Sequence, residues 1–584
     1  MIRFKVSILY LFLILFFFSC IQKKNENSYS ANHDNQEFHK SSGIEIATLS
    51  DEQTDDLVVL GKIWGFLKYY HPAIAKGNYN WDYELFRILP EILNANSKQQ
   101  RDHILIDWIE GLGNFKQSNI LEKKDIIIYP DLNWINSSGF EPKLIEILQK
   151  VRCAKRTSEH YYIELCPFVG NPVFKNENNY TDMSFPDAGY RLLSLFRYWN
   201  MINYYFPYKN LMDTRWEEVL PESIPQFINA KNRFEYYLSA LELITKIDDS
   251  HAFFYSFDLY GEDNIAPIDI TFVGDTAVVS GFYKKDFETA TGLKKGDVIL
   301  KINEKSIDEI ISKRKIYMPS SNRGALLRDM ASKLLQTDKE LLKIEYLSDY
   351  IVKQIEVPTY EKYSMSIPSK FNKTDTCFKL IEPSISYLYL GSLKGEHLLN
   401  LQKEIEKTEG LIIDLRCYPY DVLVMGRLSN YLMNSNTLFV KFSVGSITQP
   451  GTFTYTQPLN IGVYDQLEKE ICRNSKQYYK GKVAILINEI TQSHAEYSAM
   501  SYRNAPKAKV FGSPTAGADG NLSYIDLPGG IKTSMSGIGI YYPEGRETQR
   551  IGILPDVDVR PTIRGIKEGR DEVLEKAIEW IKEK

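Results

Sequence analysis

The fold and the chemistry of this protein are most visible in one stretch, Val483-Ala484-Ile485-Leu486-Ile487-Asn488-Glu489-Ile490-Thr491-Gln492-Ser493-His494-Ala495-Glu496. The apolar run at its start predicts a buried strand, and the pattern after the polar turn predicts a helix from about Ser493. A serine at such a junction suits nucleophilic catalysis, because N–H groups at the start of a helix can stabilise an oxyanion. The same pattern also fits a structural N-cap, with Glu496 completing a capping box.

Around this stretch, residues 376–565 alternate short apolar runs with helical patterns. The predicted strands are Ser386–Leu390, Gly410–Arg416, Lys482–Ile487 and Lys509–Phe511, and Leu398–Lys407 has the amphipathic period of a helix. Buried runs with intervening helices predict an α/β core. A last helix is expected over residues 566–584.

Residues 51–250 are helical by period and contain an internal repeat. Large residues recur at a constant offset of 135 positions: Trp64 and Trp199, Tyr69-Tyr70 and Tyr204-Tyr205, Pro72 and Pro207, Trp81 and Trp216, Pro90 and Pro225. A constant offset indicates two copies of one helical hairpin. We expect these aromatic side chains to form core, although an aromatic-lined ligand cleft is the alternative. Residues 124–185, between the copies, look irregular with short strands.

Residues 265–360 change character and predict a small β-rich domain. Thr276–Val279 and Asp297–Ile302 are short β-type runs separated by glycine turn signals. The string from Gly292 to Ile307 resembles the end of a PDZ domain, with Glu304 where glycine is usual. That resemblance implies a module that binds extended peptides at a sheet edge.

Four ordered motifs identify a family resemblance. They are Gly410–Arg416, Val483–Glu496, Gly512–Gly517 and Gly552–Asp556. Together with the PDZ-like insert they resemble the tail-specific, or C-terminal processing, serine peptidases, a family that includes the tricorn protease core. The resemblance covers about residues 235–565 and implies a crotonase-like ββα protease core in which Ser493 matches the nucleophile.

The general base that the resemblance implies is a histidine. One branch of the family uses a lysine 25 residues after the serine, but that position is Ala518 here. The tricorn-like branch uses a histidine from a Ser-His motif, which Ser250-His251 matches. A neutral imidazole can accept the serine proton near pH 7. His251 is therefore the expected base.

The remaining parts of the site match the family less closely. The group that orients His251 should precede Gly552, where Gln549 and Glu547 are two equally weighted candidates. The oxyanion hole should use the backbone N–H groups of His494 and Tyr420, although tyrosine reaches fewer conformations than the usual glycine. The His494 side chain could contact substrate or simply lie exposed.

The N-terminus reads as an export signal. A basic start and the apolar run Val6–Phe18 predict a signal peptide over residues 1–19, too short to span a bilayer. Ser19-Cys20 resembles a lipobox, which implies lipidation of Cys20, although a plain signal peptide with an incidental cysteine also fits. Residues 20–50 would form a polar tether. We therefore expect an exported protein, anchored by lipid to a bacterial cell envelope and facing the periplasm or the surface.

Composition sets the broad limits. Lys+Arg total 70 and Asp+Glu total 75, so the net charge is −5 with no basic block, which argues against nucleic-acid binding. Cys153 and Cys166 are the best candidate disulfide, and no Cys/His cluster predicts a metal or cofactor. The sequence thus favours a lipid-anchored serine endopeptidase that cleaves peptides or unfolded proteins. The alternative is a weak or inactive relative that binds a peptide, an apolar ligand or a glycan.

Overall fold

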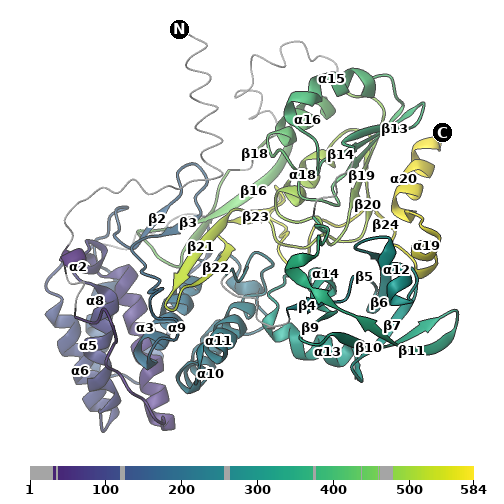
Figure 1. The fold of residues 1–584 in the computed structure, drawn as a ribbon. Coiled ribbons are helices and arrows are strands. Elements are labelled where there is room, and N and C mark those ends of the chain that lie inside the picture. The colour runs from purple at the N-terminus through teal and green to yellow at the C-terminus, as the bar shows by residue number, and fades with distance from the viewer. Residues whose placement is uncertain are drawn as a thin grey trace.

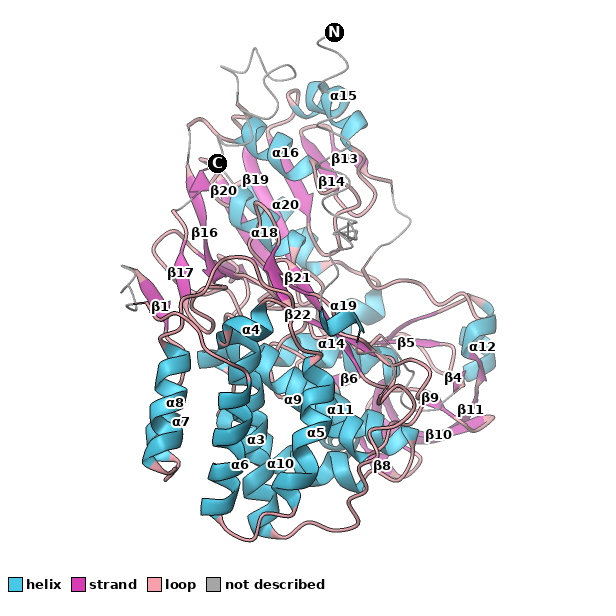
Figure 2. Cartoon of the chain, turned by 90° about the vertical axis from the view of Figure 1, so that its left-hand side faces the viewer, coloured by secondary structure: helices cyan, strands magenta, loops and turns pink. Residues whose placement is uncertain are grey.

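The computed structural model comprises a helical part, a β-rich part and an α/β part (Figures 1 and 2). The predicted signal peptide and Cys20 lie outside the residues that it describes. Within the described residues, no helix is long and apolar enough to cross a membrane. The described residues are 30–33, 37–118, 125–255, 263–371, 376–435, 437–457, 459–460 and 478–583.

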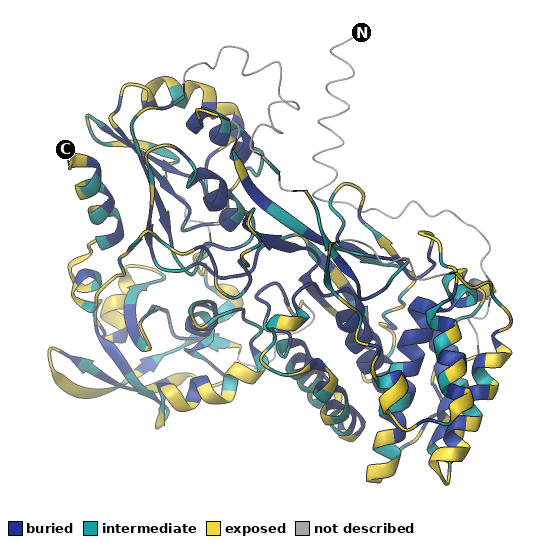
Figure 3. Ribbon diagram, turned by 180° about the vertical axis from the view of Figure 1, so that it is seen from behind, coloured by how far each residue is buried: buried dark blue, intermediate teal, exposed yellow. Residues whose placement is uncertain are grey.

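The helices of the helical part share one apolar core, with α9 buried along its whole length and the others burying one side (Figure 3). Side chains of Ser50, Asn80, Ser97, Asp187 and Asn232 cap the main helices by accepting a backbone N–H from the first turn. The helices are α2 (Ser30–His33), α3 (Asp51–Tyr70), α4 (Pro72–Ala75), α5 (Trp81–Leu93), α6 (Lys98–Gly111), α7 (Trp134–Ser137), α8 (Pro142–Arg152), α9 (Ala188–Tyr205), η1 (Lys209–Leu211), α10 (Trp216–Asn229) and α11 (Arg233–Thr245). In the sequence, the two helical groups are separated by a linker that includes the short strands β1 (Ile126–Ile128), β2 (Ile163–Leu165) and β3 (Pro172–Phe174).

The 135-residue offset relates both the helices and their contacts. Helices α5 and α10 begin at equivalent tryptophans, Trp81 and Trp216. In the first group the indoles of Trp64 and Trp81 each donate to the other's carbonyl at 2.9 Å, and Trp199 and Trp216 repeat the pattern at 2.9 Å. All four side chains are buried, so the prediction that the repeat's aromatics form core is confirmed. Helices α7 and α8 were not expected in residues 124–185, which were predicted to be irregular with short strands.

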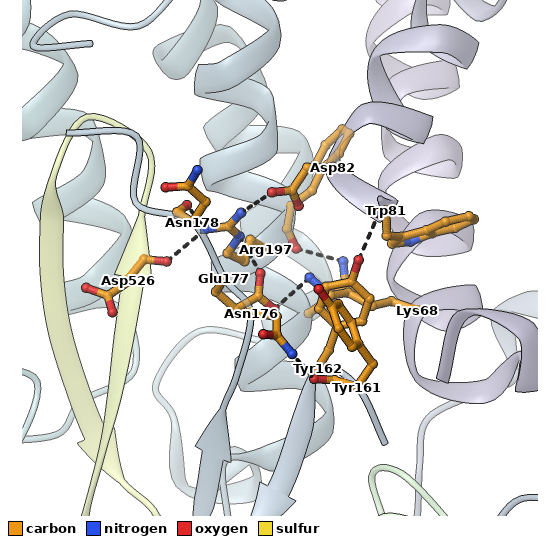
Figure 4. A network of polar contacts seen from close by, with 12 residues as sticks. Lys68, Trp81, Asp82, Tyr161, Tyr162, Asn176, Glu177, Asn178, Arg197 and Asp526 are labelled. Atoms are coloured by element: carbon orange, nitrogen blue, oxygen red, sulfur yellow. Dashed lines mark hydrogen bonds and ion pairs between the residues drawn. The ribbon is translucent and has the colours of Figure 1, made fainter. Parts of the chain in front are cut away.

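A buried charge network joins the linker to both helical groups (Figure 4). Glu177 pairs with Lys68 of α3 at 2.6 Å and with Arg197 of α9 at 2.9 Å. Arg197 also pairs with Asp82 of α5 at 2.6 Å and donates to the Asp526 carbonyl at 3.0 Å. Two cations therefore face two carboxylates, which is the condition for burying such charges.

The β-rich part forms an antiparallel sheet, β11-β10-β7-β6-β5, with α14 packed near β5, and a smaller sheet, β12-β4-β9. Asn303 and Glu304 have φ of 48° and 68°, so Glu304 occupies a left-handed turn position that favours glycine. The PDZ-like assignment stays a prediction. The elements are β4 (Asn264–Ile265), β5 (Ile268–Val273), β6 (Thr276–Phe282), α12 (Asp286–Thr291), β7 (Val298–Ile302), β8 (Lys305–Ser306), α13 (Ile307–Arg314), η2 (Lys315–Tyr317), α14 (Arg323–Lys333), β9 (Gln336–Thr337), β10 (Leu341–Ser348), β11 (Ile351–Pro358), β12 (Tyr360–Glu361) and η3 (Lys362–Ser364).

The α/β part is centred on a sheet of order β13-β14-β15-β19-β20-β24, parallel from β14 to β24. Its central strands are almost wholly buried, as continuous apolar runs predict for a sheet covered on both faces. The elements are β13 (Phe378–Glu382), β14 (Ile385–Tyr389), α15 (Gly395–Ile405), β15 (Gly410–Asp414), α16 (Val424–Leu432), β16 (Leu438–Gly445), β17 (Phe453–Tyr455), β18 (Leu459–Asn460), β19 (Lys482–Ile487), α18 (His494–Tyr502), β20 (Ala508–Gly512), β21 (Leu522–Leu527), β22 (Ile531–Ser536), β23 (Gly539–Tyr541), β24 (Val557–Asp558), α19 (Ile563–Glu568) and α20 (Glu572–Lys582).

One hairpin of the α/β part extends into the helical part. Strands β21 and β22 reach the helices α9 and α11 (Figure 1). The hydroxyls of Tyr236 and Tyr237 on α11 donate to the carbonyls of Pro528 and Gly529 at the hairpin's tip, at 2.7 and 2.8 Å. The hairpin's Ile525, Leu527, Ile531 and Met535 belong to the helical core. The helical repeat therefore holds this hairpin in place.

The candidate disulfide does not form. Neither Cys153 nor Cys166 is disulfide-bonded in the structure. Cys153 caps the C-terminus of α8, whereas Cys166 follows β2 and its backbone N–H pairs with Asn171, so each belongs to a different local structure.

Candidate active site

Ser493 has the backbone conformation of a nucleophile at a sharp turn. Strand β19 ends at Ile487 and helix α18 starts at His494, with Ser493 between them at φ 57° and ψ −122°. A positive φ is uncommon for a residue with a side chain and costs free energy. Such strain, at the junction of a strand and a helix, is the geometry that presents a serine hydroxyl at the end of a sheet.

Neighbouring groups hold this conformation. The Ser493 N–H donates to the Ala518 carbonyl at 2.9 Å and to the Glu496 carboxylate at 3.0 Å. The Thr491 hydroxyl donates to the Leu415 carbonyl at 2.8 Å, which ties the turn to the end of the neighbouring strand β15. Glu496 therefore caps the helix and, by the same hydrogen bond, helps to hold the strained backbone conformation of Ser493.

Glu496 also organises the loop that follows β20. Its carboxylate accepts hydrogen bonds from the hydroxyl of Thr515 and from the N–H groups of Gly517 and Ala518. Burial raises the pKa of Glu496, against which these hydrogen bonds act. The N–H of Ala518 donates to Glu496 and its carbonyl accepts from the Ser493 N–H, so the lysine position of the other family branch has a structural role here.

His251 lies in the loop after α11, and its ring is held in one tautomer. The ring Nδ1 is 2.9 Å from Ser536 Oγ, which is itself 3.1 Å from Asp249 Oδ1. An ionised carboxylate only accepts hydrogen bonds, so Ser536 donates to Asp249 and must accept from His251 Nδ1–H. Nε2 then carries the lone pair, which is the form that a general base requires.

The electrostatics keep His251 neutral. Burial lowers the pKa of His251, the charge of Asp249 raises it, and the charge of Arg328 lowers it, with a net lowering. An imidazole with a pKa below its usual value of about 6.5 is unprotonated near pH 7.

The structure brings the serine and histidine loops together through the residues that precede them. Gln492 Nε2 donates to the Ser250 carbonyl at 3.3 Å, and Arg328 of α14 donates to Gln492 Oε1 at 2.8 Å. Within the described residues, no hydrogen bond joins Ser493 Oγ to the His251 ring. Catalytic hydrogen bonds are often long without substrate and tighten in the complex.

The two sequence candidates for orienting His251 lie in different places. Gln549 Nε2 donates to Asp249 Oδ1 at 3.3 Å, so it reaches the histidine only through the aspartate. Glu547 pairs across a bridge with Tyr541, and among the described residues no hydrogen bond joins its side chain to this network. The carboxylate that reaches the ring through Ser536 is that of Asp249, which the sequence analysis missed. Its position two residues before His251 was the available signal.

The predicted oxyanion donors differ from each other. The His494 N–H makes no hydrogen bond within the described part of the chain, as an oxyanion donor requires. The Tyr420 N–H already donates to the Leu390 carbonyl at 3.0 Å, so this second donor is engaged elsewhere.

The His494 side chain is neither exposed nor placed as a substrate contact. Its Nε2–H donates to the Val422 carbonyl at 3.0 Å, and burial lowers its pKa to about 4. It therefore fastens the loop after β15 to the start of α18. In the same loop, burial raises the pKa of Tyr418, whose hydroxyl also hydrogen-bonds the Ser493 side chain.

The sequence of the α/β part decides the family. Residues 384–559 match the profile of Peptidase family S41. The chain carries an S41 peptidase domain. This match makes the α/β part a serine-type peptidase domain. No curated protein matches the chain.

Solved structures resemble the fold. The structure of mature CPAF complexed with lactacystin has a TM-score of 0.54 and 12% identity, and the match covers 68% of this chain and 98% of that chain. Mature CPAF gives a TM-score of 0.53 with 13% identity over 68% and 97%. The photosystem II D1 C-terminal processing protease gives 0.36 and 15% over 66% and 98%. The CPAF structures support a shared multi-domain α/β fold.

Proposed function

We propose that this S41 peptidase is an endopeptidase that cleaves peptides or unfolded proteins through an acyl-enzyme at Ser493. His251 Nε2 accepts the Ser493 proton as the hydroxyl attacks the peptide carbonyl. The imidazolium keeps its Nδ1–H on Ser536, backed by the charge of Asp249, and the His494 N–H stabilises the oxyanion. His251 then protonates the leaving amine, and water releases the acyl group by the same route in reverse.

The observation that carries this proposal is the fixed tautomer of His251, in a loop whose Ser250 carbonyl is hydrogen-bonded by Gln492, the residue before the strained Ser493. A protein that only binds peptide has no use for either feature, since strain costs about 1–3 kcal/mol. The engaged Tyr420 N–H and the Tyr418–Ser493 contact favour the alternative, a weak or inactive relative that binds a peptide, an apolar ligand or a glycan.

A fluorophosphonate that reacts with activated serines separates the two functions. We expect labelling of the wild-type protein, none of Ser493→Ala, and at least a hundredfold slower labelling of His251→Ala, since general-base catalysis contributes about 10²–10⁴. Equal labelling of all three proteins, or none of the folded wild type, would leave the binding function as the better account.

Export and anchoring are part of the same proposal. A lipid on Cys20, followed by a polar tether, would hold the peptidase at a bacterial envelope membrane, facing the periplasm or the outside. Incorporation of radiolabelled palmitate into the wild type, lost in Cys20→Ser, is the expected result. Palmitate labelling that survives this substitution would contradict the anchor.

A further inference from the structure

The hairpin that positions His251 has two faces of different character. Strands β21 and β22 pair so that Tyr524 lies opposite Ser534, and a bridge joins Phe254 to Thr533 on the other side of β22. Because side chains alternate along a strand, Phe254, Thr533 and the neighbouring Met535 face the helical core. Residues next to these in each segment, such as Phe253, Tyr255, Ser534 and Ser536, therefore share the opposite face.

That opposite face carries the catalytic histidine and several exposed rings. Ser536 on this face contacts the His251 ring at 2.9 Å, so the face is the one directed at the active site. Phe253, Tyr255 and Tyr524 lie on this same face, and they are 41%, 50% and 63% exposed. The rings are neighbours, with centroids of Phe253 and Tyr255 5.8 Å apart and those of Tyr255 and Tyr524 6.2 Å apart.

A fourth exposed ring lies at the nucleophile. The Tyr418 ring is 39% exposed, and its hydroxyl hydrogen-bonds the Ser493 side chain. Tyr524, Tyr255 and Phe253 form a row of neighbouring rings that ends two residues from His251. We call these four residues, Phe253, Tyr255, Tyr418 and Tyr524, the aromatic surface.

We propose that the aromatic surface is a subsite that binds apolar and aromatic side chains of the peptide beside the bond being cleaved. The inference rests on the proposed peptidase function and adds a substrate class to it. Exposed rings gathered at one place usually mark a binding surface, because each loses favourable apolar burial. The contact of Tyr418 with Ser493 and the position of Phe253 two residues from His251 select a substrate segment over a membrane or a second protein. An extended peptide with apolar side chains fits a strand face whose rings recur at every second position.

Two matched series of quenched fluorescent peptides test this subsite. The peptides are identical except that phenylalanine or serine occupies one position at a time, up to four residues on either side of the scissile bond. We expect wild-type kcat/KM to favour phenylalanine by about tenfold or more at one or two of these positions, the scale of discrimination by apolar pockets. In Tyr524→Ser and Tyr255→Ser, the ratio of phenylalanine-peptide to serine-peptide kcat/KM should fall towards unity.

The fluorophosphonate reaction distinguishes a failure of the proposed subsite from a failure of the proposed peptidase mechanism. It needs Ser493 and His251 but no peptide side chain, so both variants should label at the wild-type rate, which also shows that they are folded. Tyr129→Ser, a change at a distant tyrosine that is 70% exposed, should keep the preference. Equal wild-type rates on the two series, no turnover of either by a protein that labels, or a preference that survives both variants would overturn the subsite. Absence of wild-type labelling would instead overturn the peptidase mechanism.

Discussion

At the residue scale, the site depends on a hydroxyl that no motif predicts. Ser536 lies between His251 and Asp249. Because its hydroxyl donates to the carboxylate, it must accept from the imidazole Nδ1–H, which fixes the tautomer. A direct carboxylate contact would do the same with a stronger charge. Here the contact runs through Ser536, and burial lowers the pKa of His251, so the base stays neutral near pH 7.

Replacing Ser536 should separate catalysis from binding. In Ser536→Ala we expect kcat to fall about 10- to 100-fold with little change in KM, since a hydrogen bond to a charged group is worth about 1.5–3 kcal/mol. The lost acceptor stabilised the imidazolium, so the acid limb of the kcat/KM profile should move to lower pH. Peptide hydrolysis measured from pH 4.5 to 8 checks both effects.

The matched control is Ser523→Ala. Ser523 is equally buried on the paired strand, and its hydroxyl donates to Pro172 at 2.6 Å, away from His251. A loss of rate as large in Ser523→Ala as in Ser536→Ala, with an unmoved acid limb in both, would show that the effect is general damage to the hairpin.

At the element scale, the linker between the helical groups is fixed by charge as well as by apolar packing (Figure 4). Glu177 is the only carboxylate in this network that contacts both Lys68 and Arg197 among the described residues. Removing one partner of a buried pair leaves an uncompensated charge, which costs more than the pair contributes. The linker therefore depends on the balance of this network.

Glu177→Gln should lower the free energy of unfolding by about 3–5 kcal/mol. The double variant Lys68→Met/Glu177→Gln should recover part of that loss, because the unpaired ammonium is gone. Urea denaturation followed by tryptophan fluorescence measures both. Arg564→Gln, which removes the exposed pair with Glu568, should change little. Strictly additive losses in the double variant would contradict the proposed coupling.

At the scale of the whole molecule, all three parts contribute to one site. His251 follows the last helix of the repeat, Arg328 comes from the β-rich part, and Ser493 and Ser536 come from the α/β part. The role of the helical repeat was left open by the sequence. In the structure its Tyr236 and Tyr237 bind the tip of the β21–β22 hairpin, which carries Ser536. Loss of docking between the parts would therefore separate base from nucleophile.

Buried histidines should make this assembly sensitive to acid. Burial lowers the pKa of His71 and His494 to about 4 and that of His160 to about 3. The unfolded chain binds these protons near pH 6.5, so each contribution is present above that pH and is lost as pH falls below it. For His160 the loss between pH 7.5 and 5 is about 2 kcal/mol.

His160→Gln isolates this contribution. The wild type should lose about 2 kcal/mol more stability than the variant between pH 7.5 and 5, measured by urea denaturation at each pH. Comparing slopes removes the common effect of other titrating groups and any constant cost of the substitution. Parallel pH dependences of the two proteins would mean that His160 is not buried as a neutral ring.

Local patterns in the sequence predicted much of the architecture. The apolar run Lys482–Ile487 is a strand with the expected bounds, and the expected strand Lys509–Phe511 lies within β20. The family motifs led to Ser493 and His251. Helix α8 was missed because its apolar period lies within a segment rich in turn residues.

The sequence by itself determined the elements, the repeat and the two residues proposed for catalysis, because periodicity, turn chemistry and short motifs are properties of neighbouring residues. Only the tertiary structure decided that Ser536 and Asp249 hold the imidazole, that Gln549 lies by Asp249 and Glu547 does not, and that the Tyr420 N–H is engaged. These choices depend on contacts between segments up to about three hundred positions apart. The packing of the hairpin on the helices fixes those contacts, and no local pattern encodes them.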